Sequence, residues 1–236
     1  MTDHIELDSR LRLIAAMAAG SRHLADVGTD HGYIPVYLAQ TGGAERITAS
    51  DVRSGPLRAA MASARRYGVG DRISFVLADG LDGVSRDIDT AVIAGMGGET
   101  IAGILERAPW LRESGVRLVL QPQTKTDELI RRLASFGYRL SDAVLAKESG
   151  RYYLVICALP GAPEKSAAGA EALAPRLLFE KRDPLLNGYL GSLIDKYRKI
   201  AAGLERSKEG AAAAGEAEAV LAELVHMKEE TEAWLR

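Results

Sequence analysis

Three carboxylates in the first third of the chain, Asp26, Asp51 and Asp79, stand at or beside the ends of short apolar segments. If these segments are parallel strands, their carboxyl ends meet at one edge of a sheet, where ligands bind in a crevice. We expect Asp51 to accept hydrogen bonds from both ribose hydroxyls of a nucleoside, and Asp79 with Gly80 to face its adenine amino group. Considered singly, Asp51 is also a candidate helix cap and Asp79 a turn residue. Acids at three consecutive strand ends favour one shared crevice.

The residues of the first turn restrict the class of ligand that can bind there. Residues 24–33 (LADVGTDHGY) read as a strand, a tight turn and a helix N-terminus, which together hold a nucleotide-like ligand against backbone N–H groups. Gly28 and Gly32 lack the spacing of the pyrophosphate-binding G-x-G-x-x-G motif, and Asp26 and Asp30 would repel phosphates. S-adenosylmethionine has no phosphate and carries an ammonium and a sulfonium group, so these acids would attract it. The turn therefore predicts S-adenosylmethionine rather than NAD.

A glycine-rich turn is expected after the fourth apolar segment, at residues 95–98 (GMGG). Many amino-methylating enzymes carry an Asn/Asp-Pro-Pro-Tyr turn in this place, but here no side-chain acceptor is present. The glycines would let the backbone approach a substrate closely, and Met96 would offer a soft apolar surface to a ring or to the sulfonium arm. The alternative is that these glycines serve packing alone.

The histidines and the single cysteine carry weaker signals. His31 is a candidate general base, although a histidine at a helix start is more often a local hydrogen-bond donor. His4, His23 and His226 have no carboxylate or cysteine partner at ligand spacing, so we expect no metal site. Cys157 lies in an apolar run and is expected to be a buried core thiol. One cysteine allows no internal disulfide, which suits the cytoplasm.

The length, composition and net charge are those of an ordinary globular chain: 236 residues, of which 47% are hydrophobic and 26% charged, with a net charge of -2. No apolar run approaches the roughly 20 residues of a membrane span, and the N-terminus lacks the features of a signal peptide. The formal charge argues against a uniformly basic nucleic-acid coat. It leaves room for a local basic patch.

Strand and helix patterns alternate along the first 160 residues, which predicts a parallel sheet with covering helices. After an opening helix at 9–19, five strand and helix units are followed by two strands joined by a turn too short for a crossover helix. A mostly parallel seven-stranded sheet closed by such an antiparallel hairpin is the Rossmann-like fold of S-adenosylmethionine-dependent methyltransferases. The seven strands are expected at residues 23–27, 46–50, 73–78, 89–94, 117–120, 138–146 and 152–159.

The last third of the chain has a different pattern. We expect a methyltransferase domain at 1–160, a linker at 161–183 and a coiled-coil-like α-helical hairpin at 184–236. Leucine, tyrosine and isoleucine recur at spacings of 4 and 3 up to about Lys208, as in a helix that packs on another helix. An Ala/Gly stretch at 210–215 is expected to break this helix before a second one. A dimeric coiled coil is the alternative, so the sequence leaves monomer and dimer open.

Several motifs together resemble the bacterial TrmK family. These motifs are residues 25–35 (ADVGTDHGYIP), 54–56 (SGP), 78–81 (ADGL), 93–98 (IAGMGG) and 120–122 (LQP). The resemblance covers essentially the whole chain and implies methylation of N1 of the adenine at position 22 of tRNA by S-adenosylmethionine. Gly32, Thr29 and Asp51 stand where alanine, serine and glutamate are common in the family, and each preserves size or chemistry.

The resemblance also implies roles for particular residues. Adenine N1 lies on the Watson–Crick edge, so the base must be unpaired or flipped before methylation, and its lone pair needs no strong base. We expect Asp30 or His31 as a polar helper near the base, with Tyr33 beside it. Residues expected to bind substrate are Gly97, Gly98, Gln121 and Pro122. Residues expected to bind the cofactor are Asp26, Gly28, His31, Asp51, Asp79, Gly80, Gly95 and Met96.

A basic segment at 176–208, with eight Lys/Arg against four Asp/Glu, is the expected surface for tRNA phosphates. Arg53, Arg58, Arg65 and Arg66 would extend it, and the alternative is a solvated helix face. Two other functions remain open at this stage. One is methylation of a small molecule, and the other is a non-catalytic adaptor that retains a nucleotide site.

Overall fold

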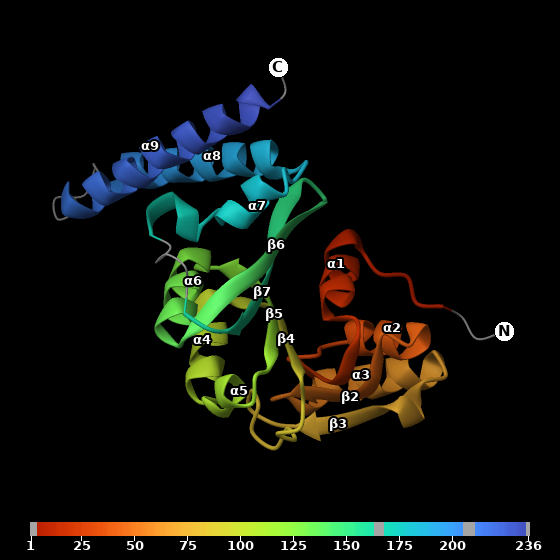
Figure 1. Cartoon of the computed structure of the whole chain (residues 1–236). Coiled ribbons are helices and arrows are strands. Elements are labelled where there is room, and N and C mark those ends of the chain that lie inside the picture. The colour runs from red at the N-terminus through yellow and green to blue at the C-terminus, as the bar shows by residue number, and fades with distance from the viewer. Residues whose placement is uncertain (1–3, 163–167, 205–210, 235–236) are drawn as a thin grey trace.

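The computed structural model describes residues 4–162, 168–204 and 211–234. These residues form a seven-stranded sheet with the order β3-β2-β1-β4-β5-β7-β6. Strands β1 to β5 are parallel, whereas β7 runs antiparallel to both β5 and β6, so the predicted fold with its closing hairpin is confirmed (Figure 1). The strands are β1 Ser21–Val27, β2 Ala44–Asp51, β3 Ile73–Leu77, β4 Thr90–Gly97, β5 Arg117–Thr124, β6 Tyr138–Glu148 and β7 Arg151–Pro160.

Helices cover both faces of the sheet. Side chains alternate between the two faces along each strand, and apolar side chains on both faces pack against these helices. On β1, Leu24 packs into one apolar cluster with Ile14 and Val36, while Ala25 packs into the other with Ile101 and Leu129. Helices α1 to α3 lie on the first face and α4 to α6 on the second (Figure 1). Their bounds are α1 Ser9–Ala18, α2 Tyr33–Thr41, α3 Ser54–Arg66, α4 Gly98–Glu106, α5 Trp110–Glu113 and α6 Thr126–Ser135, with a 3-10 turn η1 at Gly70–Arg72.

The fourth and fifth strands extend further than the sequence indicated. The predicted turn at residues 95–98 is wrong, because β4 continues to Gly97 and α4 begins at Gly98. The pairing of β4 with β5 shifts register twice here, and Gly95, at φ +77°, and Gln123 are the two residues left without a partner. Glycine tolerates this backbone, and such bulges redirect side chains beside functional sites.

The segment after β7 packs on the same core as the sheet. Ala170, Leu173 and Leu178 are buried in the cluster that also contains Ala25. They lie in or beside the 3-10 turn η2 Gly169–Ala172 and helix α7 Arg176–Glu180, inside the range expected to be a linker. Residues 163–167 of that range lie outside the described residues, and the domain division stays a prediction.

Two long helices end the chain, α8 Leu186–Leu204 and α9 Ala211–Ala233 (Figure 1). The predicted break at 210–215 is wrong from residue 211 onward, because its alanines favour helix strongly. Lys208, the predicted end of the first helix, lies outside the described residues. At the start of α8, Asp183 accepts hydrogen bonds from Leu185 N–H (2.8 Å) and from Leu145 N–H of β6 (3.1 Å). These bonds connect the start of α8 to the sheet.

A search of the described helices for membrane spans finds none with the length and apolar character that crossing a bilayer requires.

Candidate functional site

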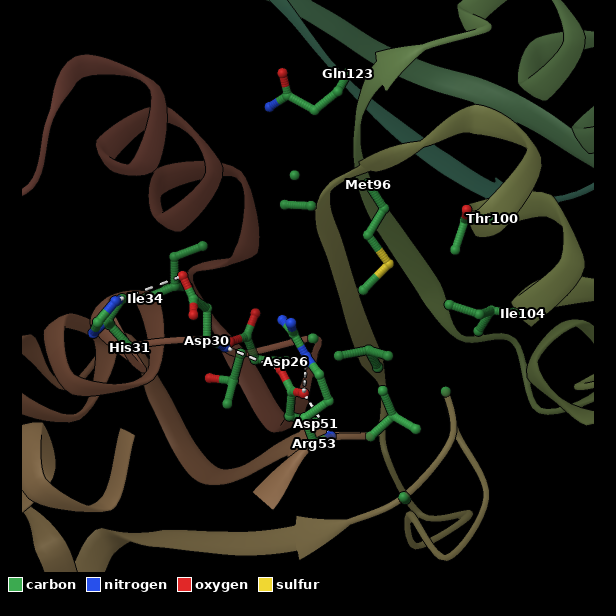
Figure 2. Close-up of a pocket in the computed structure, with 18 of the residues that line it drawn as sticks. Asp26, Asp30, His31, Ile34, Asp51, Arg53, Met96, Thr100, Ile104 and Gln123 are labelled. Atoms are coloured by element: carbon green, nitrogen blue, oxygen red, sulfur yellow. Dashed lines mark hydrogen bonds and ion pairs between the residues drawn. The ribbon is translucent and has the colours of Figure 1, made fainter. Parts of the chain in front are cut away.

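A cavity of about 950 Å³ opens at the carboxyl ends of the parallel strands, between α1 and α4 (Figure 2). Ten of the residues predicted for cofactor binding or catalysis line it. They are Asp26, Gly28, Asp30, His31, Tyr33, Asp51, Asp79, Gly80, Gly95 and Met96. The three carboxylates at consecutive strand ends therefore face one crevice.

Asp26 is the most deeply buried of these acids, with 4% of its surface exposed. Burial, with a contribution from the negative charge of Asp51, raises the pKa of its carboxyl to about 6. The Thr29 hydroxyl lies close enough to lower this pKa somewhat, yet it makes no hydrogen bond of normal geometry within the described residues. A buried carboxyl and a buried hydroxyl thus face the cavity with hydrogen-bonding capacity to spare.

Asp51 fixes the turn that precedes α2. It is 5% exposed, and its Oδ1 accepts from Arg53 N–H at 2.9 Å while its Oδ2 accepts from Asp30 N–H at 3.4 Å. The turn is also tied to β2 because Gly28 and Thr29 both donate to the Ser50 carbonyl. Asp30 takes a left-handed backbone, with φ +51°. Asp51 does not cap α3, whose N-cap residue is Arg53.

Gly28 lies directly against the Met96 side chain. Its φ is +74°, and a Cβ at this position would overlap the Met96 methyl carbon. Figure 2 shows the Met96 side chain descending into the cavity toward the acids at the ends of β1 and β2. The glycine is required both by its backbone conformation and by the close approach of the thioether.

An exposed aromatic pair stands at the rim. The rings of His31 and Tyr33 stack at 5.4 Å with an interplanar angle of 20°. His31 Nε2 lies 3.9 Å from Asp30 Oδ2, and both side chains are more than half exposed. Tyr33 is 42% exposed. These groups are therefore placed to meet a large ligand at the opening.

Asp79 is held differently from the other two strand-end acids. Its side chain is 65% exposed, and its Oδ1 accepts a hydrogen bond from Arg107 Nη2 at 3.0 Å. The acceptor that we expected for an adenine amino group is thus shared with an arginine at the end of α4.

Four predicted substrate residues, Gly97, Gly98, Gln121 and Pro122, are not among the described residues that line the cavity. A Cβ on Gly98 would overlap the Lys125 carbonyl, so the close approach it permits is to the protein's own backbone. Gln121 is fully buried in a hydrogen-bonded network. Contact between these four residues and the substrate stays a prediction.

Other lining residues were not anticipated. On α4 they recur at helical spacing, and this spacing after the glycine-rich segment would have been a usable signal. The N-terminal residues and Gln123 carried no comparable signal. The additional residues are Asp8, Arg10, Leu11, Val27, Thr29, Ile34, Val52, Arg53, Ala78, Ala94, Glu99, Thr100, Gly103, Ile104, Arg107 and Gln123.

The lining favours a ligand with positive charge. Among the described residues that line the cavity are six carboxylates, from five aspartates and Glu99, against three guanidinium groups. One guanidinium is already paired with Asp79, and that of Arg53 lies 4.0 Å from Asp51. A phosphate-bearing dinucleotide would meet net repulsion here, whereas a cationic nucleoside would be attracted.

Strand order, the reversed β7 and an acidic crevice at the strand ends define the class of Rossmann-like methyltransferases. The family described as "Methyltransferase domain" matches residues 7–156. The tRNA (adenine(22)-N(1))-methyltransferase of Bacillus subtilis (strain 168) is 30% identical over 177 residues, which cover 75% of this chain and 74% of the relative. The chain belongs to the TrmK family.

Solved structures agree with this assignment. The crystal structure of the B. subtilis m1A22 tRNA methyltransferase TrmK is 25% identical, with a TM-score of 0.76, and the match covers 98% of this chain and 99% of that one. The Streptococcus pneumoniae putative tRNA (m1A22) methyltransferase in complex with S-adenosyl-L-methionine is 27% identical, with a TM-score of 0.78. That match covers 94% of this chain and all of the other.

Proposed function

We propose that this protein transfers the methyl group of S-adenosylmethionine to N1 of an adenine in tRNA, at position 22. The observation that carries the proposal is the acidic crevice at the strand ends, joined to a wide rim with exposed aromatic rings. The relative from B. subtilis has this activity in its name, and the S. pneumoniae structure holds this cofactor. A cytoplasmic location, together with tRNA, belongs to the same proposal.

The residues present fit S-adenosylmethionine. Asp51 offers a buried carboxylate to the ribose hydroxyls, and Asp26 offers a second buried carboxyl deeper in the crevice. The bare backbone at Gly28 lets the Met96 thioether approach closely and line the cavity there. When bound, the cofactor supplies an electrophilic methyl group: the N1 lone pair forms the new C–N bond as the C–S bond breaks, and its electron pair returns to sulfur.

The protein's own part in this reaction is positioning and exclusion of water. The Met96 side chain, which lies between Gln123 and the acids Asp26 and Asp51 in Figure 2, is assigned as a wall beside the methyl donor. The stacked His31 and Tyr33 rings offer a surface on which a flipped base can rest. Because N1 attacks with its own lone pair, no buried general base is needed, which agrees with the exposure of Asp30 and His31.

The function is tested by incubation with S-adenosylmethionine labelled in its methyl group and bulk bacterial tRNA. We expect label in tRNA, recovered as 1-methyladenosine after digestion. A free nucleoside or a small metabolite should not replace the tRNA. Absence of label from RNA would remove the proposal, and label on another base would correct it.

Cofactor affinity is expected to depend on pH through Asp26. Its pKa of about 6 means that the carboxyl is mainly protonated below pH 6 and mainly ionised above it. A bound cation favours the ionised form, so affinity should rise with pH and level off above the pKa. Below it, affinity should fall by about tenfold per pH unit. Calorimetric titrations with S-adenosylmethionine between about pH 5 and 8 measure this, and Asp26→Asn should remove the dependence.

The arginines of α3 are expected to contribute most of the salt dependence of tRNA binding. Arg58, Arg65 and Arg66 are exposed on α3, which begins beside the cavity after β2 and runs back toward the start of β3, so Arg58 is the nearest of the three to the cavity. In the basic segment 176–208, by contrast, several cations are paired with carboxylates of the protein. These pairs are Arg176 with Glu230, Lys181 with Asp142 and Arg198 with Asp195.

Arg58→Ala should reduce the slope of log affinity against log salt by about one. Filter binding between about 50 and 200 mM salt gives this slope. Arg22→Ala is the control, since Arg22 lies near the start of β1, away from the strand ends that form the cavity. Equal slopes in wild type, Arg58→Ala and Arg22→Ala would place the RNA elsewhere.

A further inference from the structure

Gln123 has no role in the reaction described so far, although it lines the cavity. We propose that its side-chain oxygen accepts a hydrogen bond from the N6 amino group of the target adenine and thereby selects adenine over guanine. This inference rests on the proposed function, since it names the group that recognises the substrate base. It adds a residue and an atom that the predicted substrate contacts did not include.

The backbone places Gln123 where a base would enter. In the pairing of β4 with β5, Met96 lies opposite Pro122 and Gly97 lies opposite Thr124, so Gln123 is an extra residue without a partner. Such a bulge turns a side chain out of the regular alternation. In Figure 2 Gln123 stands at one end of the cavity, Asp26 and Asp51 stand at the other, and Met96 lies between them. Gln123 is therefore on the acceptor side of the methyl donor.

Hydrogen bonds determine which atom Gln123 presents. The Gln121 Nε2 group donates to the Pro122 carbonyl at 2.8 Å, so the Gln121 Oε1 atom must act as an acceptor. Arg10 Nη1 donates to that same oxygen at 3.2 Å, and a guanidinium has no acceptor, which fixes the orientation independently. The Gln123 group that reaches this oxygen, at 3.0 Å, must then be its Nε2 donor. Its Oε1 is then the atom of the amide that remains available as an acceptor.

Buried and packed neighbours hold this arrangement of hydrogen bonds in place. Gln121 is fully buried, and Arg10 lies 5.6 Å from the centre of the Tyr153 ring. Rotating the Gln123 amide by half a turn would set two oxygens against each other. Within the described part of the chain, the Gln123 Oε1 atom has no hydrogen-bond donor. An ordinary surface glutamine would be free to present either end, whereas this one presents an acceptor.

An available acceptor suits adenine and not guanine. Next to N1, adenine carries an amino group that donates, whereas guanine carries a carbonyl oxygen that accepts. As N1 takes the methyl group, positive charge develops over N1 and N6, and a hydrogen bond from N6 to an oxygen strengthens. The contact should therefore affect the chemical step as well as base selection.

The test is a double-change cycle between the side chain and the base. Wild type and Gln123→Leu are assayed on a tRNA whose target adenine is intact and on one in which purine replaces it, so that the 6-amino group is absent. On the adenine tRNA we expect Gln123→Leu to lower kcat/KM by about 10- to 100-fold. On the purine tRNA the same substitution should lower it by less than about threefold, because the partner group is already gone. The lower reactivity of purine N1 affects both enzymes and cancels.

Two further variants complete the design. Thr124→Val, an isosteric change on the neighbouring residue outside the cavity lining, should behave as wild type on both RNAs. Gln121→Met removes the oxygen that orients Gln123, and it should reduce the coupling between Gln123 and the amino group. A purely structural role for Gln121 would lower the melting temperature and leave the coupling unchanged.

The outcomes separate the two proposals. If wild type methylates no adenine in tRNA, the proposed function fails. If wild type is active and Gln123→Leu lowers kcat/KM by the same factor on both RNAs, only the role of Gln123 is wrong. Calorimetry with S-adenosylmethionine should give equal affinity for wild type and Gln123→Leu, which shows that a loss of activity arises on the substrate side.

Discussion

Asp51→Ala is expected to weaken S-adenosylmethionine binding by at least about 100-fold. The carboxylate is 5% exposed, and we propose that it accepts hydrogen bonds from both ribose hydroxyls. Hydrogen bonds to a charged group contribute roughly 1.5–3 kcal/mol each, and each 1.4 kcal/mol is about tenfold in affinity. The variant also frees the N–H groups of Asp30 and Arg53, which loosens the turn around the ligand. Isothermal titration calorimetry measures the effect.

The fold should survive this substitution, because a buried carboxylate costs desolvation energy that alanine avoids. Thermal denaturation without ligand checks this point. Asp51→Asn keeps the shape and one acceptor, so its affinity should fall between those of wild type and Asp51→Ala. Asp71→Ala, at an exposed aspartate outside the cavity, is the matched control. Unchanged affinity in Asp51→Ala would remove this residue from the site.

Gly28→Ala is expected to lower kcat/KM by at least about 100-fold, because the new methyl group displaces Met96. The Met96 methyl end is flexible, so it moves at little cost, but it moves within the space that the methyl donor needs. Errors of about 1 Å in position can cost about 100-fold in rate. The φ of +74° adds roughly 1–2 kcal/mol of destabilisation for any residue with a Cβ. Steady-state kinetics and thermal denaturation separate the two effects.

A second glycine supplies the control for backbone strain. Gly20 has a similar φ of +82°, and a Cβ there would meet no atom within 4 Å. Gly20→Ala should therefore lose stability to a similar extent and keep its activity. Gly28→Ala combined with Met96→Ala removes the collision and should recover part of the cofactor affinity. Equal activity in Gly20→Ala and Gly28→Ala would show that Met96 does not shape the site.

The carboxyl ends of the first three strands were predictable because local chemistry determines them. Asp26 and Asp51 end strands whose apolar pattern is clear, and glycines at positions 28 and 32 mark the turn between strand and helix. A parallel sheet then brings these positions together whatever the details of packing. The same logic identified the closing hairpin, because no helix fits in the short turn before Arg151.

The acceptor side depends on tertiary structure that no local pattern encodes. The sequence GMGG looks like a turn, but pairing with β5 extends the strand to Gly97 and creates the bulges. One of them turns Gln123 into the cavity, while Gln121, two residues earlier, is buried. Arg10 and Arg107 reach the cavity from helices whose docking depends on the assembled core. Contacts between distant segments determine these positions, and local secondary-structure propensity does not.

Methyl transfer to a single defined position tests the proposed activity most directly. Two transcripts of one bacterial tRNA, one with adenine at position 22 and one with uridine there, are incubated with the protein and labelled S-adenosylmethionine. We expect label to approach one methyl group per molecule in the first transcript, at N1 of that adenine, and none in the second. Equal labelling of both transcripts, or of neither, would contradict the account.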